Sequence, residues 1–244
     1  MSGTGYDLST FTYSQDGRIF QIEYAYKAIE TAETVVGLCC SDGIILGVEK
    51  IQTSPLEKPD ANHRIFNIDK HIGIAVCGRL PDGKNVVSRA RKECESFKKN
   101  FGRDLPGPIL AERLANYVHA NTCYGQLRVL GCAIFIASID EQVLSLFMID
   151  NSGLLRGYRG VAHGKGRQVA KPFLESFDEK GTVEQGMKVV AKALVAAHEE
   201  FKEKTWELEM SVIGPKSKYI HEHVDFEERK RLKAVAEEEH EAAE

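Results

Sequence analysis

Two apolar runs joined by a short turn constrain the fold of this chain more than any other feature. The runs cover residues 34–40 and 44–49, and Ser41, Asp42 and Gly43 connect them. An Asp-Gly pair between apolar runs predicts a β-hairpin, because both residues tolerate the positive φ angles of tight hairpin turns. Both runs are almost continuously apolar rather than alternating, which is typical of strands covered on both faces. The hairpin therefore needs a packing layer on each side.

The rest of the chain changes repeatedly between strand-like and helix-like periodicity. Strands are expected at 64–68, 72–78, 131–138, 143–149, 154–163 and 207–213. The last of these alternates, which predicts a strand with one face open to water. Helices are expected at 86–101, 109–124, 183–201 and from about 225 onward, with a capping box at Thr182 to Gln185. Strand runs flanked by helix pairs predict an α+β fold, a four-layer αββα sandwich of two packed sheets between helical layers.

The chain of 244 residues is predicted to be a single domain over 1–244, because no linker, internal repeat or low-complexity segment divides it. The formal net charge of −4 is concentrated at one end, where residues 225–244 hold eight acidic and four basic side chains. This stretch is expected to form an acidic C-terminal helix or tail. The electrically neutral remainder argues against nucleic acid as the main partner.

Composition also bears on the compartment. No run approaches the roughly 18 apolar residues that a membrane helix needs, so no membrane partner is expected. Residues 1–5 lack the basic start and apolar core of a secretory signal. The six cysteines form no CxxC pair and no zinc-ligand spacing. Free thiols in a reducing, intracellular compartment are therefore expected, with a redox or nucleophilic cysteine as the alternative.

A polar turn and an amphipathic helix precede the hairpin. The helix is expected at 17–31, with Ile19, Ile22, Tyr26 and Ile29 along one side, and residues 1–16 lie ahead of it. Some hydrolases use the chain's own first residue as nucleophile and its free amine as base. If the hairpin belongs to such a fold, a permanent extension removes that amine.

The opening stretch carries a specific resemblance. Its residues are Tyr6-Asp7, Ser14, Asp16-Gly17-Arg18, Phe20-Gln21 and Glu23-Tyr24-Ala25. They resemble the signature that opens the α-type subunits of the 20S proteasome core particle. Further matches follow in the family's order, at Thr34, Gly37, 42–43, 64–69, 148–150, 152–153, 164–167 and 208–209. The resemblance thus covers nearly the whole chain.

Three positions depart from the family's usual pattern. Many members have arginine where this chain has Leu8, and most have proline where it has Gln15 and Val129. A proline fixes φ, so its loss at Gln15 is expected to leave the turn before the helix less restricted.

The resemblance implies an N-terminal-nucleophile hydrolase-like fold of two antiparallel sheets with an extra N-terminal helix. It implies a non-catalytic structural and gating subunit, without a cofactor, in a seven-membered α ring stacked on a ring of β subunits. The expected partners are other α subunits, β-ring subunits, the C-terminal tails of a regulatory particle or other activators, and unfolded protein substrates in transit. Such a subunit would serve ubiquitin-dependent and ubiquitin-independent degradation, in the cytoplasm and the nucleus.

The gate is expected at Tyr6, Asp7 and Tyr24. Tyrosine and aspartate can hydrogen-bond to the equivalent segments of neighbouring chains, which would hold an open or a closed arrangement. Residues 1–16 would then form a gating segment that reaches toward the pore of the ring. The alternative is a frayed N-terminus with a solvated Asp7.

No catalytic residue is expected. In the related β subunits a terminal threonine attacks, a lysine lowers its pKa and a carboxylate orients the set; by resemblance these positions are Glu33, Arg64 and Glu49 here. Glu33 offers no hydroxyl nucleophile, and arginine stays protonated and cannot act as a base. The alternative is a self-processed threonine hydrolase, cut before Glu33 or Thr34. A free-standing binding protein of the same fold is a further alternative.

Arg64 has two interpretations. By resemblance it occupies the site of a lysine that binds the C-terminal carboxylate of activator tails, and a guanidinium suits a carboxylate well. Alternatively, it pairs with Glu49 or another acid inside the fold.

Three other motifs are assigned structural roles. Residues 164–167 lack the spacing of a phosphate loop and are expected to form a strand-to-helix turn. His221 and His223 share one strand face, but no third ligand is evident, so a surface strand without a metal is expected. Residues 229–231 are expected to lie on a solvated helix face, with a weak nuclear-import cluster as the alternative.

Overall fold

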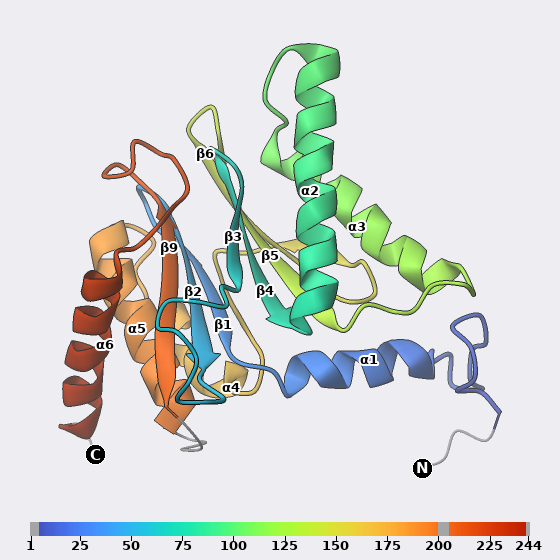
Figure 1. Ribbon diagram of the computed structural model, residues 1–244, viewed down its shortest axis with the longest axis horizontal. Coiled ribbons are helices and arrows are strands. Elements are labelled where there is room, and N and C mark those ends of the chain that lie inside the picture. The colour runs from blue at the N-terminus through green and yellow to red at the C-terminus, as the bar shows by residue number, and fades with distance from the viewer. Residues whose placement is uncertain (1–4, 200–204, 243–244) are drawn as a thin grey trace.

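The computed structural model describes residues 5–199 and 205–242. In these ranges the strands form two five-stranded antiparallel sheets, which lie face to face between helices (Figure 1). The first sheet has the order β10-β9-β2-β1-β8, formed by Glu222–His223, Trp206–Ile213, Ile44–Ile51, Val35–Cys39 and Gly160–His163. The second has the order β3-β4-β5-β6-β7, formed by Ile65–Asp69, Ile72–Gly78, Cys132–Asp140, Val143–Ile149 and Leu155–Gly157.

Helices form the two outer layers. The helices on the first sheet are α4 (Arg167–Glu175), α5 (Val183–Glu199) and α6 (Phe226–Glu241). Those on the second are α2 (Leu80–Phe101) and α3 (Gly107–Cys123). The remaining helix, α1 (Phe20–Glu30), runs along one end of the sandwich and projects beyond the sheets (Figure 1). The predicted αββα architecture is confirmed.

The hairpin strands β1 and β2 are buried on both faces, as their continuous hydrophobicity predicts. Successive side chains point to opposite faces of a strand. Leu38 and Ile45 accordingly pack under the helices of the first sheet, whereas Val35 and Leu46 pack between the two sheets. A third cluster fills the space between the second sheet and α2 and α3. Three apolar layers therefore hold the sandwich together.

The hairpin turn has a different physical basis from the predicted one. Gly43 does not have a positive φ angle. A Cβ atom on Gly43 would lie 2.1 Å from the backbone oxygen of Ile213 on β9. Glycine is needed there because β9 passes too closely for any side chain.

The predicted single strand at 154–163 is wrong. The segment forms two short strands, β7 paired with β6 and β8 paired with β1, so it crosses from one sheet to the other. The crossing occurs between two adjacent residues. Tyr158 N donates to Leu146 O on β6 of the second sheet, and Arg159 O accepts from Cys39 N on β1 of the first. Hydrophobic pattern predicts extended backbone but does not reveal which sheet supplies the hydrogen-bond partners.

The predicted wet face of β9 is also wrong. Glu209 and Ser211 alternate with apolar residues as expected, yet both are fully buried. Ser211 Oγ lies 2.9 Å from Nε2 of His221, which follows the strand, and Glu209 accepts from the backbone of Arg64 and Ile65, far earlier in the chain. Buried polar groups keep such partners. His221 is therefore an interior residue and not part of a surface strand.

The turn before α1 is closed despite Gln15. Gly17 N donates to Ser14 O over 2.9 Å, and Arg18 N donates to Ser14 Oγ over 3.0 Å. Gly17 has a φ of +73°, which favours glycine. This turn delays the start of α1 to Phe20, later than the expected residue 17.

Two other predicted helix starts are present. Thr182 N donates to Gln185 Oε1 over 3.0 Å, which is one half of the predicted capping box of α5. Asp225 caps α6 by accepting from Glu227 N over 3.0 Å. Among the helices in the described ranges, none combines the length and apolar character needed to cross a membrane.

Candidate functional site

An ion pair occupies the place where the resemblance puts catalytic threonine and lysine. Glu33 lies between α1 and β1, so it is an internal residue and not the first residue of the chain. Its Oε2 atom is 2.6 Å from Arg64 Nη2, and the two side chains are only 23% and 13% exposed. Arg64 Nη1 also donates to Gly78 O over 2.9 Å. The pair supplies neither the hydroxyl nucleophile nor the neutral amine that a threonine hydrolase uses.

Glu49 does not pair with Arg64. Its carboxylate is buried, accepts from His198 Nδ1 over 2.7 Å and accepts from Thr34 N over 3.2 Å. Of the two interpretations of Arg64, the ion pair inside the fold is present, but its acid is Glu33. Resemblance placed these three positions near one another and could not say which carboxylate takes the guanidinium.

Thr34, the other residue considered as a nucleophile, is held as part of the scaffold. Its side chain is fully buried. Its hydroxyl accepts from Gly166 N over 3.1 Å. In the intact chain the nitrogen of Thr34 is a peptide amide that donates a hydrogen bond to Glu49. It is therefore not the free amine that threonine hydrolases use.

The nearest thiol is equally unreactive. Cys77 Sγ lies 3.7 Å from Glu33 O, and burial raises the pKa of this thiol to about 12. Burial also raises the pKa of Cys40, Cys94 and Cys132 to about 12. Only the thiolate is a nucleophile, so these groups are inert near neutral pH.

The C-terminal half of α1 is anchored to the sandwich. Ile29 is fully buried in the layer between the sheets. The Tyr26 hydroxyl lies 3.2 Å from His163 Nε2, in a setting whose burial raises the pKa of Tyr26 and lowers that of His163. Arg167 Nη2 donates to Glu30 Oε1 over 2.8 Å. These contacts place α1 across the end of the fold next to the Glu33–Arg64 pair.

The predicted gate residues lie at the outer end of α1. Asp7 O accepts from Gln21 Nε2, which ties the leading segment back to the helix. Tyr24 is exposed, and its ring stacks on Phe20 at 6.1 Å between centroids. Over residues 5–199 and 205–242, no hydrogen bond joins the side chains of Tyr6, Asp7 and Tyr24 to one another. Tyr24 is thus open to groups outside this chain, whereas Tyr6 and Asp7 are half-buried.

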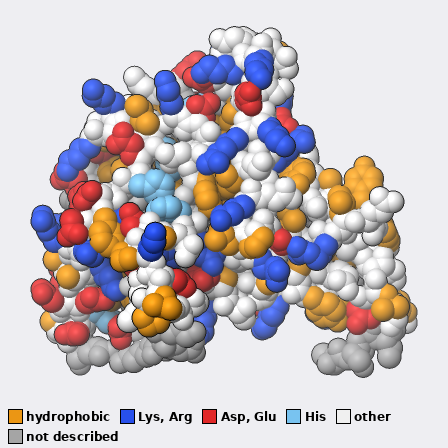
Figure 2. Space-filling view, viewed as in Figure 1, with side chains coloured by type: hydrophobic (Ala, Val, Ile, Leu, Met, Phe, Trp, Pro, Cys, Tyr) orange, Lys and Arg blue, Asp and Glu red, His pale blue; other side chains and the backbone are white. Residues whose placement is uncertain are grey.

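An exposed apolar surface surrounds this end of the molecule, and of its lining residues the sequence had indicated only Ile19 and Ile22. A groove of about 620 Å³ lies between Phe11, Tyr13, α1, the C-terminal end of α3 and the turn at 152–154. Figure 2 shows apolar side chains gathered on the part that projects with α1. The exposed members are Leu8, Phe11, Tyr13, Tyr124, Leu127 and Leu154. The signal in the sequence that could have predicted this surface was the presence of aromatic residues in an otherwise polar leading segment. Exposed apolar patches of this kind mark interaction sites.

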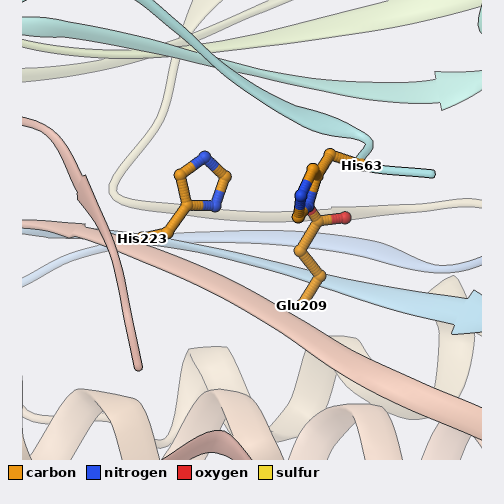
Figure 3. Close-up of side chains that lie close together, drawn as sticks. All are labelled: His63, Glu209 and His223. Carbon is orange, nitrogen blue, oxygen red and sulfur yellow. The ribbon is translucent and has the colours of Figure 1, made fainter. Parts of the chain in front are cut away.

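A second group missed by sequence reasoning lies at the edge of the first sheet. His63, Glu209 and His223 each bring one potential ligand atom to within 4.8 Å of the others (Figure 3). No third ligand for His221 and His223 was evident in the sequence, and the structure brings His63 and Glu209 to His223 instead. His221 is buried, with Nδ1 bonded to Asn67 Oδ1 and Nε2 to Ser211 Oγ.

Comparisons with known proteins place these features in a family context. A family model described as "Proteasome subunit" matches residues 29–213, and a second model, for the N-terminal signature of A-type proteasome subunits, matches residues 6–28. The chain is 45% identical to a probable alpha type-7 proteasome subunit of Schizosaccharomyces pombe over 96% of its own length and 92% of the relative's. It is 43% identical to the alpha type-3 proteasome subunit of Arabidopsis thaliana, over 96% and 94% respectively. The alpha type-3 proteasome subunit of Dictyostelium discoideum is 39% identical, over 96% and 95%.

Proposed function

The chain belongs to the proteasome subunit family and carries the signature of its α-type members, and on this premise we infer that it is a non-catalytic subunit of the α ring. One observation carries this conclusion. Where the family's hydrolytic members place a terminal threonine and a lysine, this chain has Glu33 paired with Arg64 behind a helix and a leading segment. The self-processed threonine hydrolase is not favoured, because the chain carries the α-type signature over residues 6–28 and its relatives are α-type subunits.

We propose that the chain joins a seven-membered α ring and that this ring stacks on a ring of β subunits with threonine-type endopeptidase activity. The exposed apolar side chains around the groove support this assembly, because a surface of Phe11, Tyr13 and Leu154 is better buried against a neighbour than left in water. Burial of apolar area contributes roughly 25 cal/mol per Å².

The second part of the proposal concerns entry of substrate. Tyr6, Asp7 and Tyr24 would hydrogen-bond to the equivalent segments of neighbouring subunits and narrow the pore, so that only unfolded chains pass. Support comes from the exposed Tyr24 and from the anchoring of Asp7 to α1 through Gln21, which fixes the direction in which the leading segment departs. The reducing environment implied by six free cysteines fits work in the cytoplasm and nucleus.

The third part concerns activators. Arg64 would bind the C-terminal carboxylate of an activator tail. A guanidinium donates several hydrogen bonds in a planar fork, and Glu33 accepts only some of them. Its side chain is 13% exposed, so a tail would have to enter beside the Glu33–Arg64 pair.

Replacing Arg64 tests this docking role. In a Glu33→Gln background, which avoids an unpaired acid, Arg64→Ala is expected to weaken activator binding roughly tenfold or more, since a hydrogen bond to a charged group contributes about 1.5–3 kcal/mol. Ring formation should be unchanged. The measurement is a titration of purified particles with activator. Arg103→Ala, at an exposed arginine beyond the end of α2, serves as the matched control. Equal activator affinity with and without Arg64 would remove this assignment.

A further inference from the structure

Glu209 on β9 is a fully buried carboxylate with an unusual set of partners. Its Oε2 accepts from Arg64 N over 2.8 Å, and its Oε1 accepts from Ile65 N over 3.2 Å and from His63 Nδ1 over 3.0 Å. Within the described part of the chain, His63 is the only charged partner of this acid, and it carries a charge only when protonated. An ionised group taken out of water needs a compensating charge.

The fixed cations nearby are already committed to other acids. Lys50 Nζ is 2.6 Å from Glu207 Oε2. Arg229 Nη2 is 2.7 Å from Asp60 Oδ1. The guanidinium of Arg64 is turned to Glu33. The negative charge of Glu209 must therefore be balanced by the imidazoles beside it, or by a cation bound to them.

Two imidazoles flank Glu209 on the solvent side. The side chain of His63 is 42% exposed, and His223 on β10 is exposed as well. Their ring centroids are 5.3 Å apart with an interplanar angle of 51°. Figure 3 shows the His63 ring against the carboxylate, with His223 beside them. Because both histidine side chains are exposed, water can approach this group.

We propose that His63, Glu209 and His223 bind a zinc ion, with water in the remaining position. Two imidazole nitrogens and one carboxylate oxygen suit zinc, whereas calcium and magnesium prefer oxygen ligands throughout. Tetrahedral ligand atoms about 2.0–2.1 Å from zinc stand roughly 3.3 Å from one another. His63 and Glu209 already meet this spacing, and the exposed His223 needs a small rotation because all three ligand atoms lie within 4.8 Å.

The ion would join the two sheets at one end. His63 precedes β3 of the second sheet, whereas Glu209 and His223 lie on β9 and β10 of the first. Zinc would replace the proton that His63 Nδ1 shares with Glu209 Oε1 and would neutralise the buried carboxylate. His221 is not part of the site, because both of its ring nitrogens are bonded inside the fold. The site does not depend on the gate or on activator docking.

The test is a zinc titration of the purified full chain after removal of metal with a chelator, with a coloured chelator as competitor. A Cys123→Ser background removes the one exposed thiol as a competing ligand. One equivalent of zinc is expected to bind, and His63→Gln and His223→Gln are each expected to weaken this binding roughly tenfold or more. His119→Gln, at an exposed histidine on α3, should leave it unchanged.

Two further readouts separate a metal site from a hydrogen-bonded cluster. Zinc should raise the thermal unfolding midpoint of the Cys123→Ser protein but not that of His63→Gln or His223→Gln. Cobalt in place of zinc should give the visible absorption of a four-coordinate site, again lost in both variants. Absence of stoichiometric zinc binding in the Cys123→Ser protein would overturn the proposal. So would zinc affinity in the His63→Gln and His223→Gln variants equal to that of the Cys123→Ser parent.

Discussion

Deleting residues 2–9 is expected to raise the basal peptide hydrolysis of the assembled particle severalfold without altering assembly. The deletion removes Tyr6, Asp7 and the contact of Asp7 with Gln21, which together form the proposed closure. It keeps the turn at Ser14–Arg18, the exposed apolar groove and the anchored half of α1. The surface expected to hold neighbouring subunits therefore loses only Leu8 of its exposed side chains, while the pore loses one of its obstructions.

The measurement compares purified particles with and without the deletion, using a small fluorogenic peptide and no activator. A saturating activator supplies the control: it opens the pore by another route, so both particles should then hydrolyse the peptide at similar rates. Tyr6→Phe and Asp7→Asn separate hydrogen bonding from bulk and should each give a smaller increase. Unchanged basal hydrolysis in the deletion would rule out a closing role for Tyr6 and Asp7.

The largest effect on stability is expected at Phe135. This side chain on β5 is fully buried between the two sheets, and its strand pairs with β4 and β6. Phe135→Ala should lower the free energy of unfolding by about 3–5 kcal/mol, because the loss of buried apolar area is joined by a cavity that the packed sheets cannot close. Denaturant unfolding of the full chain, followed by circular dichroism, measures the change.

Phe101 provides the matched control. It is the last residue of α2, is 62% exposed and contacts Phe97 at the surface. Phe101→Ala should cost less than about 1 kcal/mol, as surface substitutions usually do. If the two alanine variants had equal unfolding free energies, the layer between the sheets would not be the main apolar core.

Local patterns predicted the architecture well. The continuous apolar runs around Asp42 and Gly43 required covered strands, and Leu38 and Val35 indeed pack into different layers. The capping residues Thr182 and Asp225 marked helix starts that the structure contains. Such features depend on residues within a few positions of each other, where a single sequence is informative.

Features that depend on distant partners were not predictable. The polar face of β9 was expected to be wet, but His221 and the start of β3 cover Ser211 and Glu209. The segment at 154–163 has the pattern of one strand because nothing in its own residues records that Tyr158 and Arg159 bond to different sheets. A fold is specified by contacts as well as by local propensity.

The candidate site shows the same division. Resemblance placed Glu33, Glu49 and Arg64, but only the folded chain shows that Glu33 takes the guanidinium and that Glu49 pairs with His198. The roles of Tyr6, Asp7 and Tyr24 stay predictions, because they concern contacts with other subunits. The proposed zinc-binding set could not be predicted from the sequence, since His63 is far along the chain from Glu209 and His223.

The intact mass of this subunit, taken from native particles purified through it, tests the central claim most directly. We expect a chain that keeps the segment ahead of Glu33, found in a complex with other α and β subunits, and inactive toward peptides when isolated. A subunit that instead starts at Glu33 or Thr34 and hydrolyses peptides without partners would contradict the account.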